Sequence, residues 1–273
     1  MQQNQNIFDK SLYRKRRQFA HIDFLHKIVE ERFCERLDSI KRHFDNVLIY
    51  GGQGELIASH PKIGKVLQAD MVAYSNVDLI YDDESLPFAP NSFDAIFSIL
   101  HLHHANDLAG ALIQMRYALK PDGLLLVAVS GVHSLTELRQ CLQQAEVQLG
   151  GISPRIAPFM DIRDAGALLQ RAGLQLPVVD DEIITLSYEN MFALMQELRN
   201  SGEANIMLER RKNLTPASLF MKAAEEYQNN FTDGEGRVIA TAHLLFLTAW
   251  KAHANQQQPS QRGSANASLK DAL

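Results

Sequence analysis

The chain has few cysteines, no long apolar run and no excess of positive charge, and each shortage excludes a class of protein. Cys34 and Cys141 are its only cysteines, which excludes a disulfide framework and favours a reducing compartment. No apolar run approaches the roughly 18 residues that span a bilayer, and the first residues lack the apolar core of a secretory signal. The net charge of −5 argues against a general nucleic-acid surface. We therefore expect a soluble intracellular protein.

Apolar residues make up 46% of the sequence, enough for a full hydrophobic core, and their pattern alternates between two kinds of element. Helical spacing of apolar residues predicts helices over 22–44, 54–59 and 108–119. Short apolar runs predict strands at 47–50, 65–70, 77–81, 93–100 and 124–129. Strands that alternate with helices indicate a doubly wound parallel sheet with right-handed crossovers.

The second half of the chain is more helical. We predict helices over 135–149, 161–172, 191–199 and 217–227, and a last strand within 237–250. Residues 254–273 are polar and without periodicity, so we expect a flexible tail.

The stretch NVLIYGGQGELIA, residues 46–58, places Gly51, Gly52 and Gly54 between a buried strand and a helix. Glycines at such a junction let the backbone approach a nucleotide-type cofactor. A P-loop is excluded, because no Lys-Ser or Lys-Thr pair follows the glycines. A dinucleotide loop is weakly supported, because Ile57 stands where its third glycine belongs.

Two acids follow the next two predicted strands. Asp70 lies about 20 residues after the loop, where an acid that accepts both ribose hydroxyls is expected. Asp82 follows the third strand and could accept a hydrogen bond from the adenine amine. In the alternative interpretation both are solvated strand-end acids, and the glycines only shape a turn.

Longer stretches resemble a known family. Residues 82–108, DDESLPFAPNSFDAIFSILHLHHANDL, and 112–129, LIQMRYALKPDGLLLVAV, are similar to the type 11 group of class I S-adenosylmethionine methyltransferases. Short motifs outside the sheet narrow this resemblance to the mitochondrial complex I assembly factor 5 family and its bacterial relatives. They are NIFDKSL at 6–12, ISPRIAPF at 152–159, MFALM at 191–195, GEAN at 202–205 and RGSA at 262–265.

The resemblance implies an α/β, Rossmann-like class I methyltransferase fold. Its seven-stranded sheet is mostly parallel with an antiparallel last strand, and an amino-terminal helix and helical insertions are added to it. It also implies a helical extension over 1–44, a methyltransferase-like domain over 45–253 and S-adenosyl-L-methionine as cofactor. The implied cofactor-binding residues are Gly51, Gly52, Gly54, Asp70, Met71, Asp82, Asp83 and Ile99.

The glycine loop departs from the family pattern Leu-Asp-Leu-Gly-Cys-Gly-x-Gly. Aligned without a gap, Ile49 replaces the acid, and Gln53 and Glu55 replace the second and third glycines. The lost acid normally helps to hold the methionine ammonium group.

Three histidines, His101, His103 and His104, follow the fourth predicted strand, where the reactive end of a cofactor would lie. The resemblance implies His103 as the catalytic residue, acting as general base or substrate clamp. Three imidazoles would also suit a metal ion. Strand alternation, however, would place His101 and His103 on one side and His104 on another, so we expect no metal site.

Three functions are compatible with these observations. The first is an S-adenosylmethionine-dependent methyltransferase acting on a protein, the second an arginine hydroxylase on the same fold, and the third a non-catalytic assembly chaperone with an altered cofactor loop. The retained Asp70, Asp82 and His103 favour the enzymes, and the loop substitutions favour the chaperone. The resemblance implies a complex I subunit as partner, with room for peripheral membrane association. The compartment would be the cytoplasm in a bacterium and the mitochondrial matrix in a eukaryote.

Overall fold

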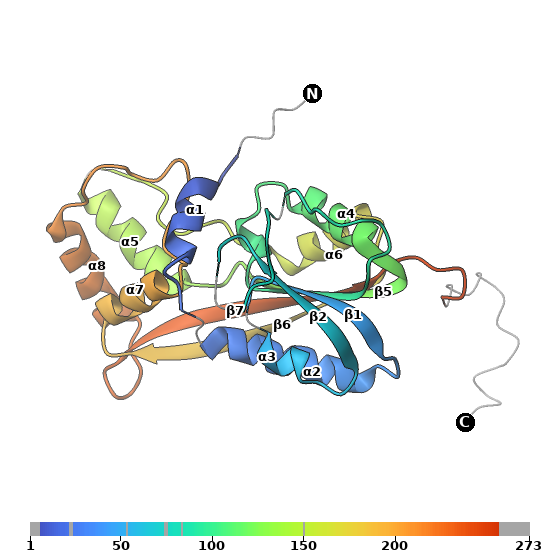
Figure 1. The fold of residues 1–273 in the computed structure, drawn as a ribbon. Helices are drawn as coiled ribbons and strands as arrows, with labels where there is room; N and C mark the ends of the chain where they lie inside the picture. The colour runs from blue at the N-terminus through green and yellow to red at the C-terminus, as the bar shows by residue number, and fades with distance from the viewer. Residues whose placement is uncertain are drawn as a thin grey trace, which may run out of the picture.

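A seven-stranded sheet forms the centre of the molecule in the computed structural model (Figure 1). The structure describes residues 6–21, 24–52, 54–73, 76–82, 84–149 and 151–256. The strand order is β3-β2-β1-β4-β5-β7-β6. The strands are β1 (Phe44–Tyr50), β2 (Ile63–Asp70), β3 (Leu79–Ile80), β4 (Phe93–Ile99), β5 (Leu119–Ser130), β6 (Gln175–Tyr188) and β7 (Val238–Trp250).

All neighbouring strands from β3 to β5 are parallel, and β7 runs antiparallel to both β5 and β6. The predicted fold class, including its antiparallel last strand, is therefore confirmed. The resemblance implied seven strands, but the strands read from the residues did not include β6.

Helices cover both faces of the sheet (Figure 1). On one face, α4 (Leu108–Ala118) and α6 (Ile162–Arg171) contribute buried side chains such as Leu112 and Leu169 to a core with the strands. On the other, α2 (Phe24–Ser39) and the short α3 (Glu55–Ala58) contribute Phe33 and Ile57. The apolar stripes read from the sequence therefore mark the sheet-facing sides of these helices.

A separate group of helices lies at the amino-terminal end of β7. The helices α5 (Thr136–Gln148), α7 (Met191–Asn200) and α8 (Ala217–Asn230) form a third core with the first residues of β7. These are the helical insertions expected from the sequence. Among the described residues, no helix combines the length and the apolar character that crossing a membrane requires.

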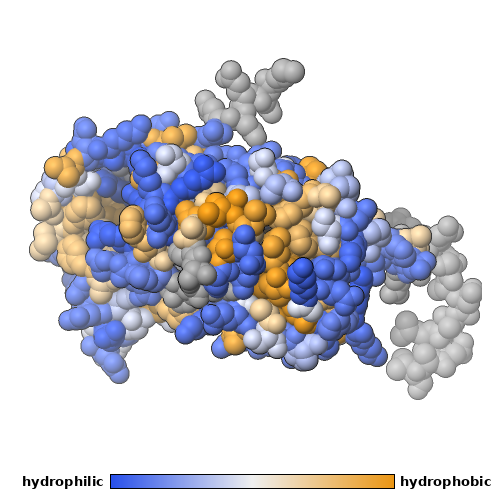
Figure 2. Space-filling model, in the orientation of Figure 1, coloured by the Kyte–Doolittle hydropathy of each residue, from blue (hydrophilic) through white to orange (hydrophobic). Residues whose placement is uncertain are grey.

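The first helix, α1 (Lys10–Arg17), lies against the loops that follow β1, β2 and β4. It begins after Asp9, whose side chain accepts a hydrogen bond from the amide of Leu12 at 3.0 Å. Phe8 and Tyr13 pack with Met71, Ile206 and Met207 in a small buried cluster. Figure 2, in the orientation of Figure 1, shows hydrophobic residues near the middle of the visible face, with polar residues around them.

Candidate functional site

The glycine loop has the backbone conformation that its sequence predicts. Gly51 has φ +87°, and a Cβ atom there would lie 2.5 Å from Cβ of His101 and 2.8 Å from the carbonyl oxygen of Ile99. Only glycine fits this junction, because positive φ and the close approach both disfavour a side chain. Gln53 lies outside the described residues.

Asp70 ends β2 and is buried; it pairs with Arg17 from α1, and its Oδ1 also accepts hydrogen bonds from the amides of Met71 and Val72. The Arg17 guanidinium donates from Nε to Oδ1 at 2.9 Å and from Nη2 to Oδ2 at 2.7 Å. Nη2 also donates to the carbonyl oxygen of Gly51 at 2.5 Å. The side chains of Arg17 and Asp70 are 4% and 1% exposed. Both oxygens of the predicted ribose acid are therefore engaged in a buried, two-pronged ion pair.

The same helix covers the neighbouring candidate positions. Arg14 forms an ion pair with Asp82, the predicted adenine contact. The hydroxyl of the fully buried Tyr13 lies 3.0 Å from Nδ1 of His101. Positions 13, 14 and 17 of α1 thus meet the ends of β4, β3 and β2, where an adenosyl group would be held. We call these strand ends, where the sequence predicts the adenosyl group, the adenosyl pocket.

The remaining predicted cofactor residues occupy different places. Met71 is buried against α1. Ile99 belongs to the core on the side of α2, and its side chain lies beneath Gly52. Gly54, with φ +59°, is pressed onto the buried side chain of Ile49. Asp83 lies outside the described residues.

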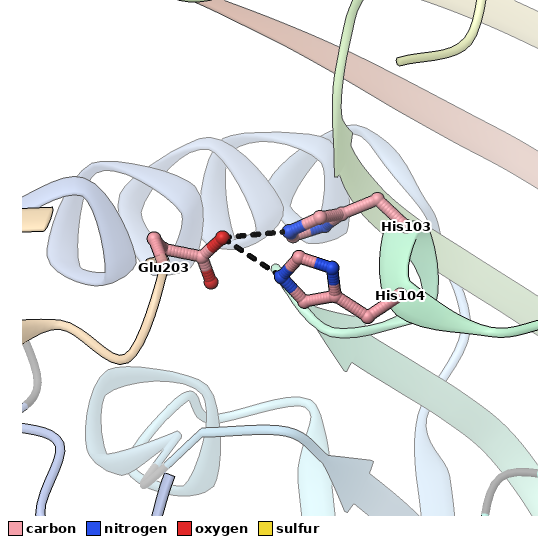
Figure 3. Close-up of side chains that lie close together, drawn as sticks. All are labelled: His103, His104 and Glu203. Carbon is pink, nitrogen blue, oxygen red and sulfur yellow. Dashed lines mark hydrogen bonds and ion pairs between the residues drawn. The ribbon is translucent and has the colours of Figure 1, made fainter. Parts of the chain in front are cut away.

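His103 lies in a cluster beside this pocket, on the short 3₁₀ helix η1 (Leu102–His104). Nε2 of His103 and Nε2 of His104 lie 3.2 Å and 2.9 Å from the same oxygen, Oε2 of Glu203 (Figure 3). The predicted strand-like alternation of these histidines was wrong, because the chain turns into η1 after β4. Adjacent residues of a tight turn can reach a common partner.

The electrostatics of the cluster follow from its burial. Burial, partly offset by Glu203, lowers the pKa of His104 to about 4, so its imidazole is neutral at neutral pH. Burial alone would raise the pKa of Glu203, but His104 and His103 outweigh it and hold that pKa well below its usual range. Burial, and then the charge of Arg17, also lowers the pKa of His101 well below the ordinary value. The neutral imidazole of His104 therefore lies beside the ionised carboxylate of Glu203.

A mainly apolar cavity of about 240 Å³ opens beside His103, His104 and Glu203. Leu100, Leu138, Phe159, Tyr188, Leu194 and Phe220 are among the residues that line it. Glu197, from α7, lines the same cavity, as do Arg155 and Arg199. The cavity could hold a side chain with an aliphatic stem and a polar end.

Sequence reasoning did not identify Arg17, Tyr13, His104 or Glu203 as site residues. Glu203 lies within the motif Gly-Glu-Ala-Asn at 202–205, whereas Tyr13 and Arg17 follow the motif at 6–12 and lie outside it. The signal that could have found Glu203 was its place in a family-like motif outside the sheet; Arg17 and Tyr13 belong to no such motif.

Comparison with known proteins agrees with this architecture. Residues 65–127 match a methyltransferase domain family. The YcgJ protein of Bacillus subtilis has a similar fold, with a TM-score of 0.55 at 15% identity over 82% of this chain and all of that chain (100%).

Relatives in sequence extend over nearly the whole chain. The arginine-hydroxylase NDUFAF5 of human mitochondria is 39% identical, and that of Rattus norvegicus is 37% identical; each match covers 97% of this chain, with 82% and 83% of the relatives' lengths. A malonyl-[acyl-carrier protein] O-methyltransferase of Xylella fastidiosa is 32% identical, over 81% of this chain and 79% of that protein. The chain therefore belongs to the NDUFAF5 family and has a Rossmann-like methyltransferase fold.

Proposed function

We propose that the chain hydroxylates an arginine side chain of a protein, the activity named for its NDUFAF5 relatives. The observation that carries this proposal is the ion pair of Arg17 with Asp70. Because that pair uses both oxygens of the ribose acid, an adenosyl cofactor does not fit the pocket while α1 lies there. A reaction that needs no adenosyl cofactor therefore suits the structure better than methyl transfer.

The cavity supports an arginine as substrate. Glu203 and Glu197 can each pair with a guanidinium group, and the apolar walls suit the methylene stem. His103, on the same wall, is the proposed catalytic residue.

Hydroxylation replaces one C–H bond of the arginine by a C–O–H group. Dioxygen supplies that oxygen atom, its other atom leaves as water, and a two-electron reductant with two protons completes the balance. The chain's own residues bind and orient the arginine, and the apolar cavity limits access of water.

Mass spectrometry of complex I subunits tests the proposal. We would compare cells that express the chain, cells that lack it, and cells re-expressing Glu203→Gln. We expect one arginine to carry an additional oxygen atom only when the parent chain is present. An arginine that gains a methyl group instead would support methyl transfer. No difference in any arginine would support the non-catalytic chaperone.

Methyl transfer from S-adenosylmethionine is the second candidate, and specific observations favour it. Gly51 has the required positive φ, Asp70 ends β2, and the methyltransferase domain match at 65–127 includes most of β2 and all of β4. When bound, the cofactor would supply an electrophilic methyl group. Gly51, Gly52, Asp70, Met71 and Asp82 would surround it only after α1 has moved away.

The partner and compartment follow from the same family relationship. We propose a protein of respiratory complex I as the substrate. The place of action would be the mitochondrial matrix in a eukaryote, as the mitochondrial relatives suggest, and the cytoplasm in a bacterium.

A further inference from the structure

Three side chains on the cavity wall are arranged as ligands of a metal ion. His103 and His104 come from η1, and Glu203 comes from the segment that follows α7 (Figure 3). One potential ligand atom from each residue lies within 4.8 Å of the other two. All three residues border the cavity.

The distances within the cluster agree with a coordination shell. Metal–ligand bonds of about 2.1 Å place ligand atoms on neighbouring corners about 3 Å apart. The two Nε2···Oε2 distances are 3.2 Å and 2.9 Å. Only a small outward shift of the side chains is needed to admit an ion between them.

The donor set limits which ion could bind. Two imidazoles and one carboxylate, with the other positions open, are the ligands of mononuclear non-haem iron(II) sites, and imidazole also suits other late first-row ions. We propose that His103, His104 and Glu203 bind one divalent first-row transition-metal ion, with its open positions facing the cavity.

Each of the two histidines can present its Nε2 atom to the ion. Within the part of the chain that the structure describes, Nδ1 of His103 and Nδ1 of His104 are buried and have no hydrogen-bond partner. A proton on each Nδ1 leaves the Nε2 lone pair directed at the ion.

The alternative is a purely structural role, in which the two imidazoles fasten the loop of Glu203 to η1 by hydrogen bonds. That role predicts no specific affinity for metal. The proposed metal site does not depend on arginine hydroxylation, because an ion could bind whether the chain hydroxylates, methylates or only assembles its partner.

Cobalt(II) binding to the metal-free, full-length chain tests the site without any substrate. We expect saturable binding of a single ion, with a visible absorption band that reports nitrogen and oxygen ligands. Glu203→Gln and His104→Ala should each weaken binding by at least about ten-fold, since each removes a direct ligand. Iron(II) added anaerobically should compete for the same site.

His60→Ala is the matched control, because Nε2 of His60 lies 3.1 Å from Oδ1 of Asp38 in a pair outside the cluster. It should bind cobalt(II) like the parent. Glu203→Asp keeps a carboxylate and should bind more tightly than Glu203→Gln, which separates loss of a ligand from loss of fold. Absence of saturable binding by the parent would overturn the proposal, as would equal affinities of parent and Glu203→Gln.

Discussion

The guanidinium of Arg17 forms two hydrogen bonds, of 2.9 and 2.7 Å, to the carboxylate of Asp70. This relationship joins α1 to the end of β2, across a separation of 53 residues in the chain. In this arrangement α1 covers the strand ends at which the sequence predicts the adenosyl group, and a buried cation neutralises the carboxylate of Asp70.

Breaking this pair should destabilise the fold. Arg17→Met leaves the carboxylate of Asp70 buried without its cation, at an expected cost of about 3–5 kcal/mol in the free energy of unfolding. Lys15→Met, on an exposed position of the same helix, is the control and should change little. Urea denaturation followed by circular dichroism measures both. Adding Asp70→Leu to Arg17→Met should recover part of the loss; a further, additive loss would mean that the two residues are not coupled.

Gly51 should tolerate no side chain. Gly51→Ala forces alanine into φ +87° and places its Cβ atom 2.5 Å from that of His101, so we expect a loss of about 3 kcal/mol. Gly151→Ala is the control, because a Cβ atom there meets nothing within 4 Å. Thermal unfolding of both variants provides the comparison, and equal melting temperatures would show that the loop relaxes freely.

The amino-terminal cap of α1 should weaken in acid. The amide of Leu12, and to a smaller extent Arg210, lowers the pKa of Asp9 from the ordinary 3.8. A carboxyl whose pKa is lower when folded stabilises the helix above its unfolded pKa, and this contribution is lost as the pH falls through the folded value. The stabilisation should therefore disappear only below pH 3.8.

The amide proton shift of Leu12, followed by NMR against pH, reports this titration. Asp9→Asn keeps a capping oxygen and should abolish the pH dependence while preserving the helix. A midpoint above 3.8 in the parent would be inconsistent with the cap seen in the structure.

The central sheet could be predicted because its signals are local. A continuous apolar run, 124–129, marks β5, a largely apolar run marks β4, and the order of strands and helices allows few arrangements. β6 escaped prediction because it is an edge strand with no fully buried side chain, and Asp180, Asp181 and Glu182 interrupt its apolar pattern.

The site was harder to predict because its contacts join distant parts of the chain. Arg17 pairs with Asp70, and Glu203 meets two histidines about a hundred residues earlier, so no local spacing relates them. At Ile49 the sequence shows that the family's acid is missing. Only the structure shows what replaces it: the Ile49 side chain is buried in the core beneath Gly54.

Calorimetric titration of the parent chain with S-adenosylmethionine tests most directly whether α1 closes the adenosyl pocket. The closed pocket predicts binding no tighter than about 1 mM, equivalent to about −4 kcal/mol. Arg17→Gln, which removes the guanidinium fork but keeps a polar side chain, should bind at least about ten-fold more tightly, a gain of about 1.4 kcal/mol. Saturable micromolar binding by the parent, unchanged in Arg17→Gln, would contradict the account and favour methyl transfer.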